Sequence, residues 1–349
     1  MIMRTHILFA VMLCCCFGTL QAAEIPTLSY QTQPREYFGK RLEPRDGRII
    51  HGAGQSRSSF DAYNSVIGTT KPALFMAYSP IVGLKPGGLS GLSKELARYP
   101  NFIIPQIGFW MTVDGAPELH FEQDVAAGLH DKDIDILCDE LASLNRPVFV
   151  RIGFEFNGRW NGYQPDTYKA AFIRVVKAIR AHNLNEIAVV WCYASDIRTK
   201  DTFMNYYPGD EYVDWWGIDL FDAEHLTAED TVLFMEQAKL HKFPVMIGES
   251  TPRRIGVTGG ETSWQKWYVG YFAFMRRYPN VRSFCYISDN WANSGAWRDW
   301  GDSRLGMNPT VLAHFRRELE DPIFLHAGTE NDTRRALGLA IPRYLPVRP

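Results

Sequence analysis

The chain has 349 residues, of which 46% are hydrophobic and 22% are charged. This is the composition of an ordinary globular protein, so it excludes intrinsic disorder, collagen-like repeats and a disulfide-knot scaffold. With 37 basic and 39 acidic side chains the formal net charge is −2, which lacks the basic surplus of a nucleic-acid-binding protein, so we expect no nucleic-acid partner.

Residues 1–23 are typical of a secretory signal peptide. A short polar start precedes an apolar run at residues 7–17, which is too short to span a bilayer, and Ala22 with Ala23 offers a cleavage site. We therefore expect an exported protein, secreted or periplasmic, without a membrane span. A lipid-anchored form stays open because cysteines occupy positions 14–16.

Eight short apolar runs follow, each with the length and composition of a buried strand. They cover residues 48–54, 73–79, 102–110, 148–156, 187–195, 213–221, 244–250 and 281–288. Between and after them, apolar residues recur every three or four positions, which predicts helices at 131–145, 165–183, 227–242, 262–279 and 309–321. Thr227 and Thr262 are placed to cap two of these helices.

This alternation predicts the α/β class and a single (β/α)₈ barrel, or TIM barrel, over residues 48–326. A lead-in at residues 24–47 precedes the barrel, and a tail at residues 327–349 follows it as a strap or a loose end. The alternative is a doubly wound open sheet, but the stretch GAGQSR at 52–57 lacks the third glycine of a dinucleotide-binding turn. The barrel is therefore the favoured fold.

Three cysteines follow the predicted signal peptide, at Cys138, Cys192 and Cys285. They are odd in number, far apart in sequence and set in apolar runs, which favours buried free thiols over a disulfide framework. No spacing of His or Cys resembles a zinc motif, so we expect neither a metal ion nor an organic cofactor.

Acidic residues stand at the ends of several predicted strands. Glu155 lies at the end of the fourth strand, Glu249 at the end of the seventh and Asp219 near the end of the sixth. In a (β/α)₈ barrel these ends carry the reactive groups. Two carboxylates that face each other there suit glycoside hydrolysis with retention, in which they stand roughly 5–5.5 Å apart.

Arg151 lies four residues before Glu155 in the predicted fourth strand. Because side chains alternate along a strand, Arg151 and Glu155 are expected on one face, with Arg151 beneath the site. There it can keep a nucleophilic carboxylate ionised or pair with Asp219, and the two roles are compatible.

Aromatic residues make up 13% of the chain, and a group of them lies near the predicted strand ends. Trp160 and Tyr163 follow the fourth strand, Trp191 and Tyr193 share one face of the fifth, and Trp291 follows the eighth. Flat rings at these positions suit stacking on pyranose rings, so we expect these five residues to bind substrate.

Four further residues carry weaker predictions. His51 in the first strand is placed to hydrogen-bond a substrate, although a core histidine is the commoner role. Asn157 is expected to organise the loop after the fourth strand more than to touch sugar. Trp297 and Trp300 fit the core at least as well as a binding loop.

Three blocks of sequence carry a family resemblance. The first is RIGFEFNG at 151–158 with Trp160 and Tyr163, the second runs from Tyr206 to Asp219, and the third is PVMIGE at 244–249. In this order and on these strands they resemble glycoside hydrolase family 26, which groups β-mannanases and related β-glycanases among the retaining (β/α)₈ hydrolases. The resemblance spans roughly residues 48–320.

The resemblance implies an acid/base role for Glu155 and a nucleophile role for Glu249. Phe154 departs from the pattern, which usually has His before the acid/base residue, and Leu220 with Phe221 stands where the pattern often has Tyr. We therefore expect a secreted, monomeric, endo-acting hydrolase of a mannan-like or related β-linked polysaccharide. Other glycans (a β-glucan, a xylan or a bacterial exopolysaccharide) and a non-catalytic carbohydrate-binding barrel stay open.

Overall fold

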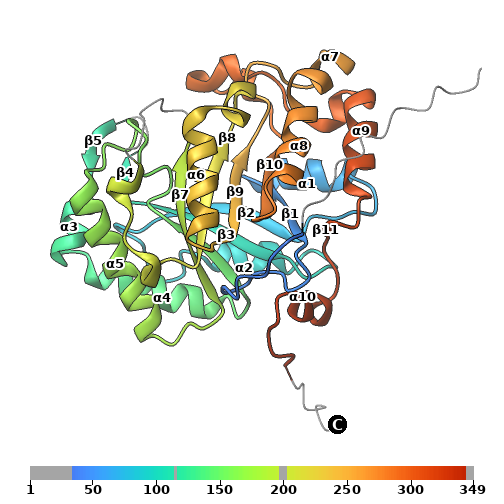
Figure 1. Ribbon diagram of the computed structural model, residues 1–349. Coiled ribbons are helices and arrows are strands. Elements are labelled where there is room, and N and C mark those ends of the chain that lie inside the picture. Colours follow the sequence, from blue (N-terminus) through green and yellow to red (C-terminus); the bar gives the residue numbers. More distant parts are fainter. Residues whose placement is uncertain (1–33, 114–115, 196–202, 343–349) are drawn as a thin grey trace, which may run out of the picture. The chain divides into compact units, whose positions relative to one another are not determined.

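Eight parallel strands close into a barrel in the computed structural model, which describes residues 34–113, 116–195 and 203–342 (Figure 1). The strands are β1 (Ile49–Gly54), β2 (Leu74–Pro80), β3 (Ile104–Trp110), β6 (Val148–Ile152), β7 (Ile187–Ala194), β8 (Trp215–Leu220), β9 (Val245–Ser250) and β10 (Val281–Ile287). Pairing of β10 with β1, from Ser283 opposite Ile50 to Ile287 opposite Gly54, closes the ring. The predicted (β/α)₈ barrel is confirmed, and each predicted strand is present.

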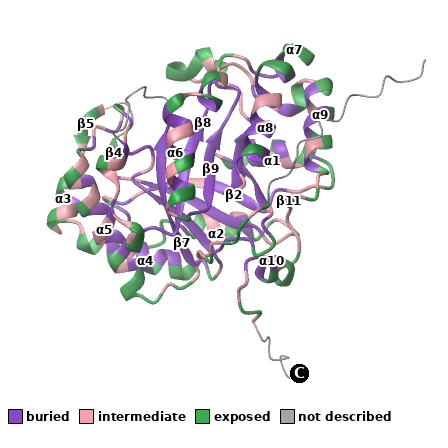
Figure 2. Cartoon of the chain, viewed as in Figure 1, coloured by how far each residue is buried: buried purple, intermediate pink, exposed green. Residues whose placement is uncertain are grey.

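Helices surround the strands and turn their buried faces toward them (Figures 1 and 2). The longer ones are α1 (Arg57–Val66), α2 (Ser90–Leu96), α4 (Asp131–Ser143), α5 (Pro165–Ala181), α6 (Glu229–Leu240), α8 (Val269–Arg277) and α9 (Pro309–Leu319). The five predicted helices are confirmed, but the predicted threonine caps are wrong. Ala228 precedes α6, and Gly260 precedes α7 (Glu261–Ser263), which runs through a π-helical turn at Trp264–Tyr268 into α8.

Several shorter strands and helices lie outside the eight-stranded barrel. They are the antiparallel hairpin β4 (Thr112–Val113) and β5 (Ala116–His120), α3 (Glu122–Ala127), β11 (Phe324–Leu325) beside the start of β1, and α10 (Glu330–Ala336). Short 3₁₀ helices occupy Phe203–Tyr206, Asp210–Tyr212, Ala223–Leu226, Trp291–Asn293, Gly295–Trp300 and Leu305–Met307. The 3₁₀ helices at Trp291–Asn293 and Gly295–Trp300 follow β10 and therefore lie at the carboxyl end of the barrel, the end that carries the reactive groups in this fold.

The described parts of the lead-in and the tail pack on the barrel. Arg35 donates hydrogen bonds to the carbonyl oxygens of Val281 at 2.6 Å and Met275 at 2.7 Å. In α10, Arg334 is only 6% exposed and donates to both carboxylate oxygens of Glu186, at 2.8 and 3.0 Å. The predicted signal peptide at 1–23 lies outside the described residues, and in the described ranges no helix is both long and apolar enough to cross a membrane.

The side chains inside the barrel change from apolar to polar along the barrel axis. Ile50, Leu74, Phe149 and Trp215 belong to one apolar cluster inside the ring of strands. Further toward the carboxyl ends, the inward side chains include fully buried polar residues, among them Gln106, Arg151 and Asp219. Buried charge costs several kcal/mol unless it is paired, so this layer marks the functional end of the barrel. The three predicted free thiols, Cys138, Cys192 and Cys285, are confirmed as buried and unpaired.

Candidate active site

A cleft of about 740 Å³ opens at the carboxyl ends of the strands. Glu155 and Glu249 both line it. The aromatic residues that line it are Tyr78, Trp110, Phe154, Trp160, Phe221, Trp291, Trp297 and Trp300. The cleft thus combines two carboxylates with flat apolar walls, which is the composition that a sugar-binding site requires.

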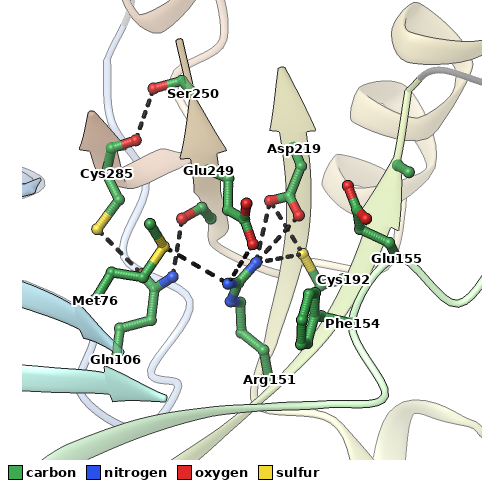
Figure 3. Close-up of polar contacts among 12 residues, drawn as sticks. Met76, Gln106, Arg151, Phe154, Glu155, Cys192, Asp219, Glu249, Ser250 and Cys285 are labelled. Atoms are coloured by element: carbon green, nitrogen blue, oxygen red, sulfur yellow. Dashed lines mark hydrogen bonds and ion pairs between the residues drawn. The ribbon is translucent and has the colours of Figure 1, made fainter. Parts of the chain in front are cut away.

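Arg151 on β6 holds two carboxylates at the floor of this cleft (Figure 3). Its Nη2 donates to Glu249 Oε1 at 2.7 Å, and its Nη1 donates to the two oxygens of Asp219 at 3.1 and 3.3 Å. Arg151 and Asp219 are fully buried, whereas Glu249 keeps 8% of its surface exposed to the cleft. Arg151 therefore pairs with Asp219 as predicted and also bonds Glu249, which is the carboxyl group of this pair that a ligand can reach.

In this cluster, burial and ion pairing shift the pKa values of the charged groups in opposite directions. Burial raises the pKa of Asp219 to about 8, and the adjacent guanidinium opposes this rise. The pKa of Arg151 is affected in the opposite sense, because burial lowers it but the negative charges of Asp219 and Glu249 raise it well above its ordinary value. Arg151 therefore stays charged, and it donates charge-assisted hydrogen bonds to both carboxyl groups.

Glu155 lies on a sharp turn and not on a strand. The prediction that it shares a strand face with Arg151 is wrong, because β6 ends at Ile152 and the chain then turns. Glu155 has a φ of +52°, a conformation that costs a non-glycine residue about 1–3 kcal/mol. The side-chain amide of Asn161 supports the turn by donating to the carbonyl oxygens of Phe154 and Glu155, each at 3.0 Å.

The environment of Glu155 favours its protonated form. Burial raises the pKa of Glu155 well above its ordinary value, and the negative charges of Asp219 and Glu249 raise it further. The indole Nε1 of Trp160, which donates to Glu155 Oε2 at 2.6 Å, partly opposes this effect. One cleft therefore holds two carboxyl groups in different environments: the pKa of Glu155 is raised well above its ordinary value, and Glu249 accepts a hydrogen bond from a guanidinium.

Four of the predicted binding residues lie outside the cleft, so their predicted contact with substrate is wrong. Trp191 and Tyr193 on β7 point outward into the core between strands and helices, because the face they share is the helix-facing one. Trp191 stacks on Phe156 with ring centroids 4.4 Å apart, and the hydroxyl of Tyr193 donates to Asp230 at 2.7 Å.

Tyr163 and His51 are the other two predicted binding residues that lie outside the cleft. Tyr163 is 4% exposed, and its hydroxyl accepts a hydrogen bond from the backbone N–H of Met111 at 2.8 Å. His51 is fully buried, hydrogen-bonded to the hydroxyl of Tyr63 and to the ring of His326. Burial also lowers the pKa of His51 well below its ordinary value, so it is a neutral core histidine.

Asn157 organises the loop, as its sequence position indicated. Its side-chain amide donates to the carbonyl oxygen of Ala194 at 2.8 Å and accepts from the N–H of the same residue at 2.9 Å. This pair of bonds ties the turn that carries Glu155 to the end of β7. Trp160 and Trp291 are the two predicted binding aromatics that do line the cleft.

Several cleft residues were missed at the sequence level. Trp110 ends β3 and Phe221 directly follows β8, so the strand-end rule applied to Glu155 and Glu249 would have found them. Trp297 and Trp300 line the cleft as well, which their position in sequence left undecided. Within residues 34–113, 116–195 and 203–342, no group of three or more His, Cys, Asp or Glu is arranged to hold a metal ion.

The chain is similar in sequence or in fold to proteins that are named as xylanases and mannanases. The chain is 27% identical over 319 residues to a "Beta-1,3-xylanase" of Alcaligenes sp, covering 83% of this chain and 67% of that protein. It is 28% identical over 321 residues to "Beta-1,3-xylanase TXYA" of Vibrio sp, covering 83% and 68%. Among solved structures, Bacillus subtilis mannanase man26 superposes with a TM-score of 0.58 at 16% identity, covering 81% of this chain and 87% of that one, which shows a shared fold.

The family profile of "Glycosyl hydrolase family 26" matches residues 113–287. That segment runs from β4 to the end of β10 and contains Arg151, Glu155, Asp219 and Glu249. The chain therefore belongs to glycosyl hydrolase family 26 and is a glycoside hydrolase.

Proposed function

We propose that this chain hydrolyses β-linked polysaccharide at internal bonds with retention of configuration, with Glu155 as acid/base and Glu249 as nucleophile. The single observation that carries the proposal is the contrast between these two side chains in one cleft. Glu155 is held protonated by burial and by negative neighbours, while Glu249 accepts a hydrogen bond from a buried guanidinium. Retaining hydrolysis requires this division of roles.

The two steps use these groups in turn. In the first, Glu155 gives its proton to the departing glycosidic oxygen while a Glu249 oxygen bonds to the anomeric carbon, which forms a glycosyl ester. In the second, the Glu155 carboxylate takes a proton from a water molecule whose oxygen attacks the same carbon, and the ester bond to Glu249 breaks. Arg151 stabilises the carboxylate that leaves in this second step.

β-1,3-Xylan is the substrate that we propose. The two curated relatives that match over 83% of this chain are both named as β-1,3-xylanases. Phe154, an apolar ring in the cleft wall, is compatible with a pentose because xylose carries no hydroxymethyl group that needs a polar partner. Mannan, the substrate named for the structural neighbour, is the second candidate.

A panel of polysaccharides tests this function. The protein is incubated with β-1,3-xylan, β-1,4-xylan, β-1,4-mannan and β-1,3-glucan, and released oligosaccharides are separated by size. We expect a ladder of products from β-1,3-xylan. Release from mannan alone would correct the substrate, and no release from any glycan by folded protein would contradict the proposed reaction.

Replacing Trp160 by Phe is expected to move the basic limb of the pH profile of kcat/KM to higher pH. The indole N–H favours the ionised form of Glu155, so its removal raises the pKa of Glu155 further and keeps the acid protonated over a wider range. Trp110→Phe, in the same cleft, is the matched control. A basic limb that stays in place or moves to lower pH would show that this hydrogen bond does not tune the acid.

Trp297→Ala is expected to raise KM for polysaccharide about tenfold with little change in kcat. The ring is 40% exposed, lines the cleft and lies 6.4 Å from the ring of Trp291, so it offers a platform away from the reacting bond. Loss of one stacking ring costs about 1–1.5 kcal/mol. Steady-state kinetics measure the effect, with Leu240→Ala on the outer face of α6 as the control. An unchanged KM would remove Trp297 from the binding surface.

Export and a monomeric state complete the proposal. Export rests on the signal-peptide pattern of residues 1–23. Mass analysis of the protein recovered from culture medium or periplasm tests cleavage after Ala23, and sedimentation tests the monomer.

A further inference from the structure

Three neighbouring strands place Tyr78, Gly108 and Arg151 in one row across the barrel. Tyr78 on β2 pairs with Gly108 on β3, and Gly108 pairs with Arg151 on β6. Residues paired in this way in a parallel sheet project to the same face, here the interior of the barrel. Gly108 thus separates an inward tyrosine from the arginine that holds the nucleophile.

The missing side chain at Gly108 brings the two outer members of the row together. A Cβ atom at this position would lie 2.8 Å from the Tyr78 ring and 2.9 Å from the Phe154 ring, closer than real Cβ contacts allow. Because Gly108 leaves this space empty, both rings lie over β3 and contact each other, with centroids 5.5 Å apart. Any larger residue at position 108 would displace one of them.

The two rings enclose the guanidinium of Arg151. Its central carbon lies 4.7 Å from the centroid of the Phe154 ring and 5.7 Å from that of Tyr78, which is the range of cation–π attraction. Phe154 lies beside the guanidinium in Figure 3. With Asp219 bonded to Nη1, the arginine has little freedom to turn away from Glu249.

The hydroxyl of Tyr78 has two neutral acceptors in the structure, Gln55 Oε1 at 3.4 Å and Met76 Sδ at 3.5 Å. Glu249 lines the same cleft and is bonded to the guanidinium that lies beside the Tyr78 ring. Its negative charge contributes to the raised pKa of the Tyr78 hydroxyl. An ionised carboxylate accepts a shorter and stronger hydrogen bond than an amide or a thioether.

We propose that Tyr78 is a positioning residue for the nucleophile: its hydroxyl donates to the Glu249 carboxylate, and its ring, together with Phe154, fixes Arg151 against the same group. This inference rests on the proposed role of Glu249. The donor comes from β2, on the far side of Arg151 from β8, where Leu220 and Phe221 carry no hydroxyl. Burial and the negative charge of Glu249 raise the pKa of Tyr78 well above its ordinary value, so the hydroxyl keeps its proton to donate.

Among the described residues, six ionisable groups from the neighbouring elements interact with the Glu249 carboxylate. They are Tyr78 on β2, Arg151 on β6, Glu155 on the turn after β6, Cys192 on β7, Asp219 on β8 and Cys285 on β10. Arg151 is the one positive charge among these six, and removal of the Tyr78 hydroxyl takes away a neutral donor without changing the net charge.

Tyr78→Phe tests the proposal, because it removes the hydroxyl and keeps the ring over Arg151. The pH profile of kcat/KM is measured with the full chain and an aryl β-glycoside, and its acid limb reports the ionised nucleophile of the free enzyme. We expect the acid limb to move up by about one pH unit and kcat to fall about tenfold. Tyr63→Phe, which removes a buried hydroxyl bonded to His51, is the matched control and is expected to leave the acid limb in place.

The outcomes separate this proposal from the proposed function. A shift in Tyr78→Phe alone supports the positioning role. If the acid limb of Tyr78→Phe is unchanged, or if Tyr63→Phe shifts it equally, the positioning role is overturned, while the proposed function stands as long as the wild-type enzyme is active and needs Glu249. If the wild-type enzyme proves not to need Glu249, both the proposed function and this inference are overturned.

Discussion

Glu249→Gln is expected to lower kcat by at least about 10⁴-fold on any polysaccharide that the enzyme cleaves, which corresponds to ~5.4 kcal/mol of transition-state stabilisation. The amide cannot form the glycosyl ester, but its oxygen still accepts the hydrogen bond from Arg151 Nη2. Arg151 also keeps Asp219 as a partner, so the variant leaves no uncompensated buried charge. Product release and the thermal unfolding midpoint are the measurements.

Glu140→Gln is the matched control for this variant. Glu140 is as buried as Glu249, each 8% exposed, and accepts hydrogen bonds from the backbone N–H groups of Gly87 and Leu89 away from the cleft. It is expected to lose stability but not kcat. A Glu249→Gln variant that keeps more than a few per cent of wild-type kcat would contradict the nucleophile assignment.

Glu155→Ala is expected to lose about 10³-fold in kcat on polysaccharide and much less on an aryl glycoside with an acidic leaving group. The sugar hydroxyl needs a proton in order to leave, and Glu155, whose pKa is raised well above its ordinary value, supplies it. A nitrophenolate leaves without that proton, so its first step survives the substitution, and hydrolysis of the glycosyl ester becomes slow.

Azide distinguishes loss of the acid/base group from loss of the fold. The anion needs no general base, so it attacks the ester at Glu249 and yields a β-glycosyl azide with rate recovery in Glu155→Ala. The same addition is expected to leave Glu249→Gln inactive. If Glu155→Ala and Glu249→Gln respond alike to azide, or if the rescued product is the α-azide, the division of roles between the two residues is wrong.

The barrel and the two strand-end carboxylates could be predicted because both depend on local sequence. An apolar run of seven or eight residues that is bounded by turns and rich in β-branched and aromatic side chains favours a strand, and a lone acid at its end is costly to bury without a purpose. Glu155 and Glu249 were found in this way. The turn that carries Glu155 was not, since it depends on the amide of Asn161, six residues further along the chain.

The binding residues were predicted less well because the sequence does not say which face of a fully buried strand points inward. Every residue of β7 is buried, so alternation of polarity gives no signal there, and Trp191 with Tyr193 proved to face the helices. The Tyr78, Gly108 and Arg151 row depends on the register of three strands that are far apart in sequence. Such a contact becomes visible only after the barrel has closed.

Covalent trapping tests the central claim most directly. A 2-deoxy-2-fluoro-β-xyloside or xylobioside with a good leaving group slows the second step and accumulates the glycosyl ester. Proteolysis and mass spectrometry then locate the added sugar. We predict one sugar per chain, attached to Glu249, and none in Glu249→Gln. A sugar attached to another residue, or inversion at the anomeric carbon without any labelled protein, would contradict the two-glutamate mechanism.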